Sequence, residues 1–213
     1  MSRAVIFVNG QIKHIEPVHR LVRPDDTILA ADGGTHLALA AGLTPSIIIG
    51  DLDSLNQADQ MHVKKAGCKI IKHPRDKDEI DFELALSFVA ESGFSEILII
   101  GALGGRLDQT LGNLSVLTNP RFAGLDTRID DGTEAAWFLR DRREITGSPG
   151  DTISLIPWGG DVTGATTTGL RWPLHNESLF ADKTRGISNE LMDEKGSISI
   201  NSGLLLVVQR RNM

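Results

Sequence analysis

The sequence has a single cysteine, Cys68, among its 213 residues, so no disulfide can form within the chain. Because structural disulfides belong to oxidising compartments, this scarcity favours a reducing one, and we expect a cytoplasmic protein. Cys68 lies in the run GCKII, which predicts a buried small residue and not a nucleophile. No apolar run is long enough to cross a bilayer, and the amino-terminal run lacks a small-residue cleavage site, so neither a membrane protein nor a signal peptide is expected.

The chain has too few basic residues to be expected to bind nucleic acid without regard to sequence. The formal net charge is -6 at pH 7, whereas sequence-independent binding of nucleic acid needs a basic face. The chain also lacks the G-x-x-x-x-G-K-[ST] and G-x-G-x-x-G patterns, so the common nucleotide-binding folds are not indicated. An acidic protein that handles phosphate groups must therefore supply local cations, from a metal and from a few placed arginines or lysines.

The first part of the chain alternates short apolar runs with helical periodicity. This alternation predicts an α/β domain with a mostly parallel sheet covered by helices on both faces. In the clearest helix, Phe82, Ala85, Leu86 and Val89 recur at helical spacing. In the last helix we expect Leu107, Leu111 and Leu114 to form the apolar face. The expected strands are 4–9, 27–31, 47–50, 69–72 and 96–101, and the expected helices include 55–66, 77–92 and 106–117.

The pattern of apolar residues changes after about residue 129. Residues 130–139 predict a strand, a turn and a second strand, and from Arg143 onward helical periodicity is absent. Short apolar runs separated by Gly, Pro, Asn and Asp are typical of an antiparallel β-sandwich or small barrel. We expect an α/β domain over residues 1–145 and a β-sandwich domain over residues 146–213, with no low-complexity linker between them.

Two carboxylates follow the buried strand expected at Ile47–Gly50. Asp51 and Asp53, with Ser54 beside them, would lie at the carboxyl edge of the sheet, where open α/β sheets place their ligands. Carboxylate oxygens are hard ligands suited to Mg²⁺. An ordinary turn with Asx hydrogen bonds is the alternative interpretation of the same residues.

Further acidic residues lie at equivalent places along the chain. Asp32 follows the second strand and precedes Gly33, while Asp78 and Asp81 begin the helix expected at 77–92. Each has a plain alternative, as a turn former or as an acid favoured by a helix dipole. Together with Asp51 and Asp53 they would converge on one edge of the sheet, where a cation must offset the negative charge.

A possible phosphate cradle follows the strand EILIIG. Gly104 and Gly105 give a ligand access to backbone N–H groups at a helix start, and Arg106 offers a forked positive charge. Asp108 follows in the first turn of that helix. An acidic metal site beside an anion site predicts Mg²⁺-dependent transfer of a phosphoryl-type group.

These motifs, taken in order, resemble those of the thiamine pyrophosphokinase family over nearly the whole chain. The matching segments are ADGG at 31–34, GDLDS at 50–54, the K-D-x-x-D pattern at 77–81, GALGGRLDQTLGN at 101–113, TTTGLRWPL at 166–174, GISNE at 186–190 and GLLLVV at 203–208.

The resemblance implies an enzyme that moves the β,γ-pyrophosphoryl group of ATP to the hydroxyethyl oxygen of thiamine and releases AMP. It also implies a homodimer with thiamine sites between subunits. It assigns catalytic roles to Asp51, Asp53, Asp78 and Asp81, with Mg²⁺ on Asp51, Asp53 and Asp78. It assigns the nucleotide side to Asp32, Gly33, Gly104, Gly105, Arg106 and Asp108. Whether Asp51 or Asp53 also orients or deprotonates the thiamine hydroxyl stays open.

On the thiamine side the resemblance points to Trp172, Ser188 and Asn189. The Trp172 ring suits stacking on a cationic thiazolium, and a core position is its alternative. Ser188 and Asn189 would form hydrogen bonds with the aminopyrimidine of thiamine. The alternative is that both are ordinary turn residues in a loop. Two positions depart from the family pattern, since Ile80 stands where Thr is usual and Gln109 where His is usual.

Two other functions remain compatible with these residues. One is a related Mg²⁺-dependent kinase that acts on another cationic heterocycle. The other is a thiamine-binding or nucleotide-sensing protein without turnover, for which so many clustered carboxylates would have little use.

Overall fold

The computed structural model describes residues 3–12, 14–74 and 78–212, and the chain forms two compact units, Met1–Gly132 and Thr133–Met213. The sequence had suggested a division at residues 145 and 146. The strands β7 (Glu134–Leu139) and β8 (Arg142–Thr146) belong to the second unit because they pair with β14 (Leu205–Arg210) and β13 (Lys195–Ser199). Such long-range pairing leaves no local mark in the sequence.

The first unit is built on a parallel sheet, as the sequence predicts. Its strands are β1 (Arg3–Phe7), β2 (Thr27–Ala31), β3 (Ile47–Gly50), β4 (Lys69–Lys72), β5 (Glu96–Ile100) and β6 (Asp126–Asp130). They lie in the order β6-β5-β1-β2-β3-β4, and each pairing along this order is parallel. Strand β1 is buried throughout and β5 almost so, because helices cover both faces of the sheet.

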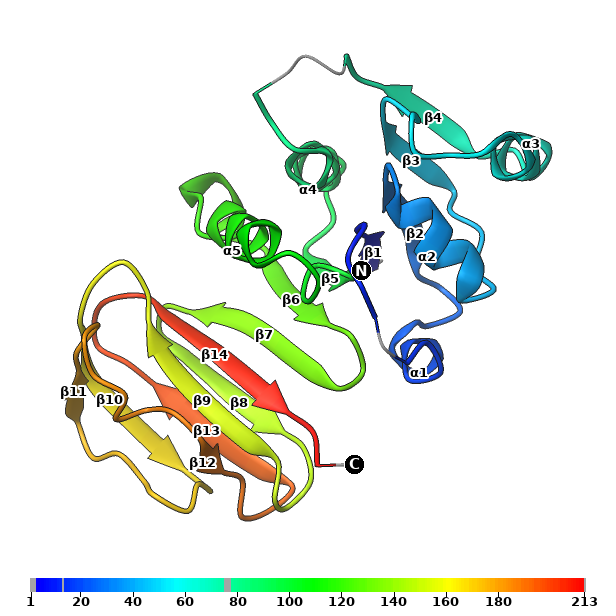
Figure 1. Ribbon diagram of the computed structural model, residues 1–213. Helices are drawn as coiled ribbons and strands as arrows, with labels where there is room; N and C mark the ends of the chain where they lie inside the picture. Colours follow the sequence, from blue (N-terminus) through cyan, green and yellow to red (C-terminus); the bar gives the residue numbers. More distant parts are fainter. Residues whose placement is uncertain (1–2, 13, 75–77, 213) are drawn as a thin grey trace. The chain divides into compact units, whose positions relative to one another are not determined.

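Helices lie on both faces of this sheet (Figure 1). They are α1 (Val18–Leu21), α2 (Gly34–Ala40), α3 (Gln57–Lys65), α4 (Asp81–Glu91) and α5 (Leu107–Val116), followed by the 3₁₀ turn η1 (Pro120–Phe122). Helix α4 packs on β1, β2 and β3, while α2 packs on β1 and β2 from the other side. None of the helices in the described part of the chain is both long and apolar enough to cross a membrane.

Two expectations about helices are wrong. Helix α4 starts at Asp81, not at residue 77: Asp78 and Glu79 form a bend before it, and Lys77 lies outside the described residues. Of the three leucines expected on the apolar face of α5, only Leu114 is buried, whereas Leu107 is 71% exposed and Leu111 is 46% exposed. The buried residues of the helix are Asn113 and Leu114, so the spacing of the leucines identified one of the three positions correctly and the other two wrongly.

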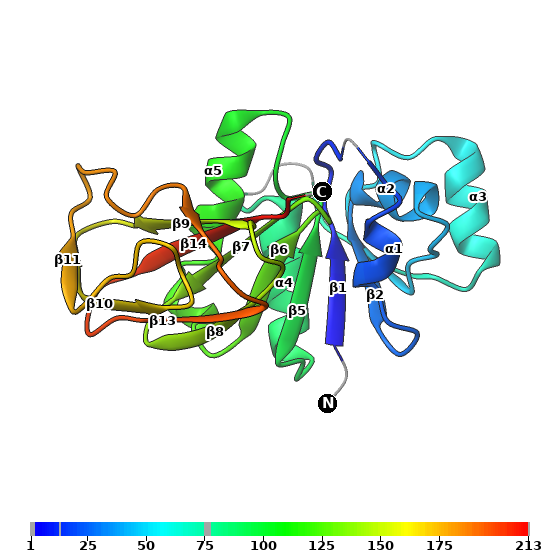
Figure 2. The ribbon, with the colours of Figure 1, turned by 90° about the horizontal axis from the view of Figure 1, so that it is seen from below.

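The second unit is a β-sandwich, which confirms the expected fold class. One antiparallel sheet has the order β12-β9-β14-β7 and the other, four-stranded, has the order β11-β10-β13-β8. The additional strands are β9 (Thr152–Pro157), β10 (Val162–Thr168), β11 (Glu177–Leu179) and β12 (Asn189–Glu190). Figures 1 and 2 show the sheets as two layers, and apolar residues of both layers, such as Trp137, Leu155 and Ile198, form one core between them.

Candidate active site

The strand order of the first unit reverses between β1 and β5, and parallel sheets bind ligands at such a switch point. The loops after these two strands border a pocket of about 390 Å³. Asn9 and Gly10 line it from one side, and Gly104, Gly105 and Arg106 line it from the other. The glycine-rich segment therefore lines a pocket at the switch point of the sheet.

A second pocket, of about 230 Å³, adjoins the first. It is lined by Asp32, Gly33 and Asp81, and it shares Asn9 and Asn113 with its neighbour. We call the two pockets together the switch-point groove. Gly33 is tightly enclosed, because a Cβ atom there would lie 2.5 Å from Cγ of Asn9. The groove thus joins the expected phosphate loop to the strand-end carboxylates.

Asp32, Asp51 and Asp53 form an acidic cluster at the carboxyl edge of the sheet. Each offers one carboxylate oxygen, and these oxygens all lie within 4.8 Å of one another. Leu52 N–H donates to Oδ1 of Asp32 at 3.1 Å, which ties the loop after β3 to the loop after β2. Asp53 N–H donates to Oδ1 of Asp51 at 3.0 Å. This is the Asx turn of the alternative interpretation, and it exists together with the cluster.

The acidic cluster also has strained backbone and a partly buried carboxyl group. Leu52 has φ of +67° and Asp32 has φ of +39°, a region that residues with side chains seldom adopt. Burial raises the pKa of the Asp32 carboxyl, and the charges of Asp81, Asp51 and Asp53 raise it further. The Ser54 hydroxyl opposes this shift in the pKa, although its buried Oγ atom has no hydrogen bond of regular geometry to any described residue.

The donor set of the acidic cluster fits Mg²⁺. All three groups are carboxylates, the ligand type that this ion prefers, and their mutual repulsion is relieved when a cation lies among them. Asp81, at the start of α4, is near enough to act on Asp32 electrostatically. Asp78 is exposed and lies outside the group of residues that could share one ion, within the part of the chain that the structure describes.

Arg106 and Asp108 lie together on the exposed side of the glycine-rich loop. Arg106 Nε donates to Oδ1 of Asp108 at 3.1 Å, and this bonding holds the pKa of the Asp108 carboxyl below its usual value. Gly104 and Gly105 have φ of +82° and +78°, which side chains disfavour. A phosphate group that reached this loop would compete with Asp108 for the guanidinium.

The sequence analysis did not select three residues that belong to this region. Asn9 follows β1 as Asp32 follows β2, so a polar residue at a strand end was the available signal. Buried Asn113 donates from Nδ2 to the carbonyl oxygen of Ala102 at 3.0 Å and so fastens α5 to the loop after β5. The third, His36 in α2, carries no sequence signal.

Ile80 is the N-cap of α4 and makes no side-chain hydrogen bond there, whereas the Thr that is usual at this position could supply one.

In the second unit, the residues expected to contact thiamine lie close together. Trp172 is 50% exposed and not in the core, and Arg171 lies 5.1 Å from its ring centroid. Asn189 is buried, and its side-chain amide bonds the backbone of Trp172: Oδ1 accepts from Trp172 N–H at 3.1 Å, and Nδ2 donates to its carbonyl oxygen at 2.7 Å. Ser188 is exposed with φ of +59°. Asn189 therefore orients Trp172, and its Oδ1 and Nδ2 atoms each make a hydrogen bond to the Trp172 backbone.

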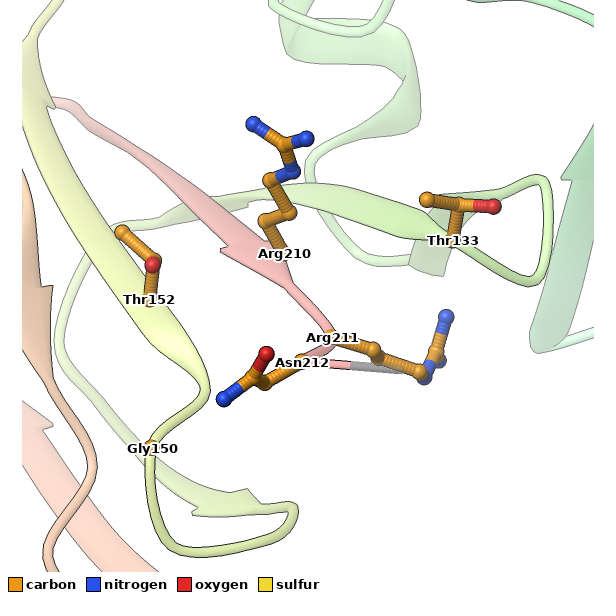
Figure 3. Close-up of a pocket in the computed structure, with 6 residues that line it drawn as sticks. All are labelled: Thr133, Gly150, Thr152, Arg210, Arg211 and Asn212. Atoms are coloured by element: carbon orange, nitrogen blue, oxygen red, sulfur yellow. The ribbon is translucent and has the colours of Figure 1, made fainter.

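The second unit also has a polar pocket of about 390 Å³ near the end of β14. Arg210, Arg211 and Thr133 are among its lining residues (Figure 3). The guanidinium groups of Arg210, at the end of β14, and Arg211, just after it, point in different directions in Figure 3. Arg210 Nε lies 3.8 Å from a carboxylate oxygen of Glu134. The pocket lacks convergent positive charge for one anion.

Comparison with known proteins gives family matches to both parts of the chain. The family model described as "Thiamin pyrophosphokinase, catalytic domain" matches residues 18–129. The model described as "Thiamin pyrophosphokinase, vitamin B1 binding domain" matches residues 141–205.

Individual relatives agree with these matches. The chain is similar to "Thiamine pyrophosphokinase" of Bacillus subtilis (strain 168), at 31% identity over 210 residues, covering 97% of this chain and 98% of the relative. A crystal structure of thiamine pyrophosphokinase from Bacillus subtilis superposes with a TM-score of 0.89 and 26% identity over 100% of both chains. The yeast thiamin pyrophosphokinase structure, at 19% identity, has a TM-score of 0.78 over 98% of this chain and 86% of its own, which shows the shared fold.

Proposed function

Since this chain belongs to the thiamine pyrophosphokinase family, we propose that it transfers the pyrophosphoryl group of ATP to thiamine, giving thiamine diphosphate and AMP. The observation that carries the proposal is the acidic cluster of Asp32, Asp51 and Asp53, in which Asp32 also lines the switch-point groove. A kinase needs a cation beside its nucleotide, and this cluster has the ligands for one.

Asp51 and Asp53 would hold Mg²⁺, and Asp32 would complete the set from the neighbouring loop. A bound Mg²⁺ would supply positive charge that stabilises the ATP phosphates and the negative charge of the departing AMP. Asp81 supports the cluster from the start of α4. The sequence analysis also assigned metal binding to Asp78. Its exposed position in the bend before α4 gives less support for that role than the position of Asp32 does.

The switch-point groove receives ATP. Gly104 and Gly105 offer backbone N–H groups to the phosphates, and Arg106 turns from Asp108 towards a phosphate oxygen. Gly33 leaves room for the side chain of Asn9 beside the groove, because a Cβ atom at this position would lie 2.5 Å from Cγ of Asn9. Positioning and charge neutralisation by these residues supply most of the catalysis, since phosphoryl transfer needs little covalent help from the protein.

Thiamine binds through the second unit. The ring face of Trp172 that Arg171 does not cover stacks on the cationic thiazolium, and Asn189 holds the Trp172 backbone in place. Ser188 is exposed and offers its hydroxyl to the aminopyrimidine. The homodimer with thiamine sites between subunits is part of the proposal, and exposed Trp172, Ile187 and Met192 on this unit support an interface there. The reducing, cytoplasmic location remains the prediction made from the single cysteine.

The test is to incubate the purified protein with Mg²⁺, ATP and thiamine and to measure thiamine diphosphate after oxidation to its fluorescent thiochrome. Thiamine binding is measured in parallel by calorimetry. We expect product only when thiamine, ATP and Mg²⁺ are all present, and none with excess EDTA. Binding of thiamine without any thiamine diphosphate would identify a binding protein and overturn the proposal.

A further inference from the structure

The imidazole ring of His36, in the first turns of α2, bridges two other segments. Its Nε2 atom lies 2.9 Å from the carbonyl oxygen of Ser54, the residue after Asp53. Its Nδ1 atom lies 2.9 Å from Oδ2 of Asp59 in α3. The ring thus connects the helix that follows Asp32 to the loop that carries Asp51 and Asp53.

Both partners of the ring are acceptors only, since one is a carbonyl and the other a carboxylate. Asp59 is itself held in place: its carboxylate accepts from Nδ2 of Asn56 at 2.8 Å, and its backbone N–H donates to Oδ1 of Asn56 at 2.9 Å, which caps α3. The start of α3 therefore fixes the ring, and the ring fixes the Ser54 carbonyl.

This bridge lies next to backbone that is strained. Leu52, two residues before Ser54, has φ of +67°, and strained residues keep such a conformation only where the surroundings impose it. The Leu52 N–H bond to Asp32 holds one end of the loop, and the His36 bond to Ser54 holds the other. The distance between Asp32 and the pair Asp51 and Asp53 depends on both contacts.

We propose that His36 is a positioning residue that holds the loop of Asp51 and Asp53 at the spacing from Asp32 that a divalent cation needs. The inference rests on the proposed metal site and adds a residue with no contact to the ion. Outer residues that orient metal ligands typically change metal affinity about 10- to 100-fold when they are replaced.

The experiment measures Mn²⁺ binding to the full chain by electron paramagnetic resonance of the free ion, with Mn²⁺ alone as the probe. His36→Phe keeps a ring of similar size and removes both ring nitrogens, whereas His36→Gln supplies an amide donor for the Ser54 carbonyl oxygen. His62→Phe is the matched control, because His62 is exposed on α3 and has no ring hydrogen bond to the residues that the structure describes. Thermal unfolding and the KM for thiamine are measured for each variant.

We expect His36→Phe to weaken Mn²⁺ binding about 10-fold, with His36→Gln between it and the wild type and His62→Phe unchanged. The Mg²⁺ concentration for half-maximal activity should rise in the same order, while the KM for thiamine stays constant. Lower thermal stability of His36→Phe with unchanged Mn²⁺ affinity would reduce His36 to a structural contact and overturn the inference. Wild-type protein that forms thiamine diphosphate without binding Mn²⁺ would refute the inference but not the proposed function.

Discussion

Gly10 lies directly against the carbonyl oxygen of Gly101, where strands β1 and β5 end: a Cβ atom on Gly10 would come within 2.0 Å of that oxygen. The neighbouring backbone is equally close, since Val8 N–H donates to the carbonyl oxygen of Ile100 at 2.8 Å. Both segments are backbone, so neither can move aside without moving a strand. The close approach shapes the floor of the switch-point groove.

Replacing Gly10 by Ala should therefore push the two loops apart. We expect a loss of about 1–3 kcal/mol in the free energy of unfolding, the usual cost of overpacking, and a higher KM for ATP. Urea denaturation and steady-state kinetics measure the two effects.

Gly112→Ala is the matched control. Gly112 lies inside α5, where an added Cβ would meet nothing within 4 Å. Alanine favours a helix over glycine by roughly 0.5–1 kcal/mol, so this variant should be more stable than the wild type. Equal stability of the two variants would contradict the account of Gly10.

Asp51→Asn tests the acidic cluster. The amide keeps the shape of the side chain and can still accept the Asp53 N–H of the Asx turn, so the fold should persist. Loss of a direct metal ligand should lower kcat by more than about 100-fold, since even outer residues cost 10- to 100-fold. Asp25→Asn, at an exposed carboxylate before β2, should leave kcat unchanged. Activity of Asp51→Asn close to that of the wild type would exclude Asp51 as a metal ligand.

Trp172→Ala tests the thiamine side. One cation–π contact contributes roughly 1–2 kcal/mol when it is shielded from water, so the KM for thiamine should rise about 10-fold. Trp172 is half exposed, so the melting temperature should change little. Phe180→Ala, at an equally exposed aromatic residue of the same unit, is the control. A KM that rose equally in both variants would point to a general effect on the unit.

The ion pair of Arg3 and Asp26 predicts how stability depends on pH. Burial alone would raise the pKa of the Asp26 carboxyl, but hydrogen bonds and charge from Arg3, with the Arg23 N–H, outweigh burial and lower it. A lowered folded-state pKa means that the pair stabilises the fold above the unfolded pKa of about 3.9 and that this stability is lost as pH falls through the folded value. Asp26→Asn should cost about 2 kcal/mol at pH 7.

That difference between the wild type and Asp26→Asn should shrink towards zero as the pH is lowered below about 4. Urea denaturation at a series of pH values measures it. A difference that stayed constant down to pH 3 would show that Asp26 acts by packing and not by its charge.

The sequence predicted the strands of the first unit well, because parallel strands are buried on both faces and are continuous apolar runs. The strand Ile47–Gly50 was placed to the residue, and this placed Asp51 and Asp53 at the carboxyl edge. Their approach to Asp32 followed from the parallel order of β2 and β3, which is why the acidic cluster could be anticipated.

The sequence could not predict side-chain burial and contacts that depend on packing between distant segments. The outward side of α5 carries Leu107 and Leu111, which helical spacing had placed in the core. Asn189 remains a predicted ligand of thiamine, but the sequence showed no sign that its amide also hydrogen-bonds the backbone of Trp172, 17 residues earlier in the chain. The sequence did not single out His36, because its proposed role depends on the contact between its ring and the Ser54 carbonyl oxygen in the loop after β3.

The most direct test of the proposed reaction is ³¹P nuclear magnetic resonance of the protein with Mg²⁺, ATP and thiamine, followed over time. Transfer of the pyrophosphoryl group predicts that AMP and thiamine diphosphate appear together in equal amounts, with no ADP. Formation of ADP with thiamine monophosphate would show transfer of a single phosphoryl group and would contradict the account.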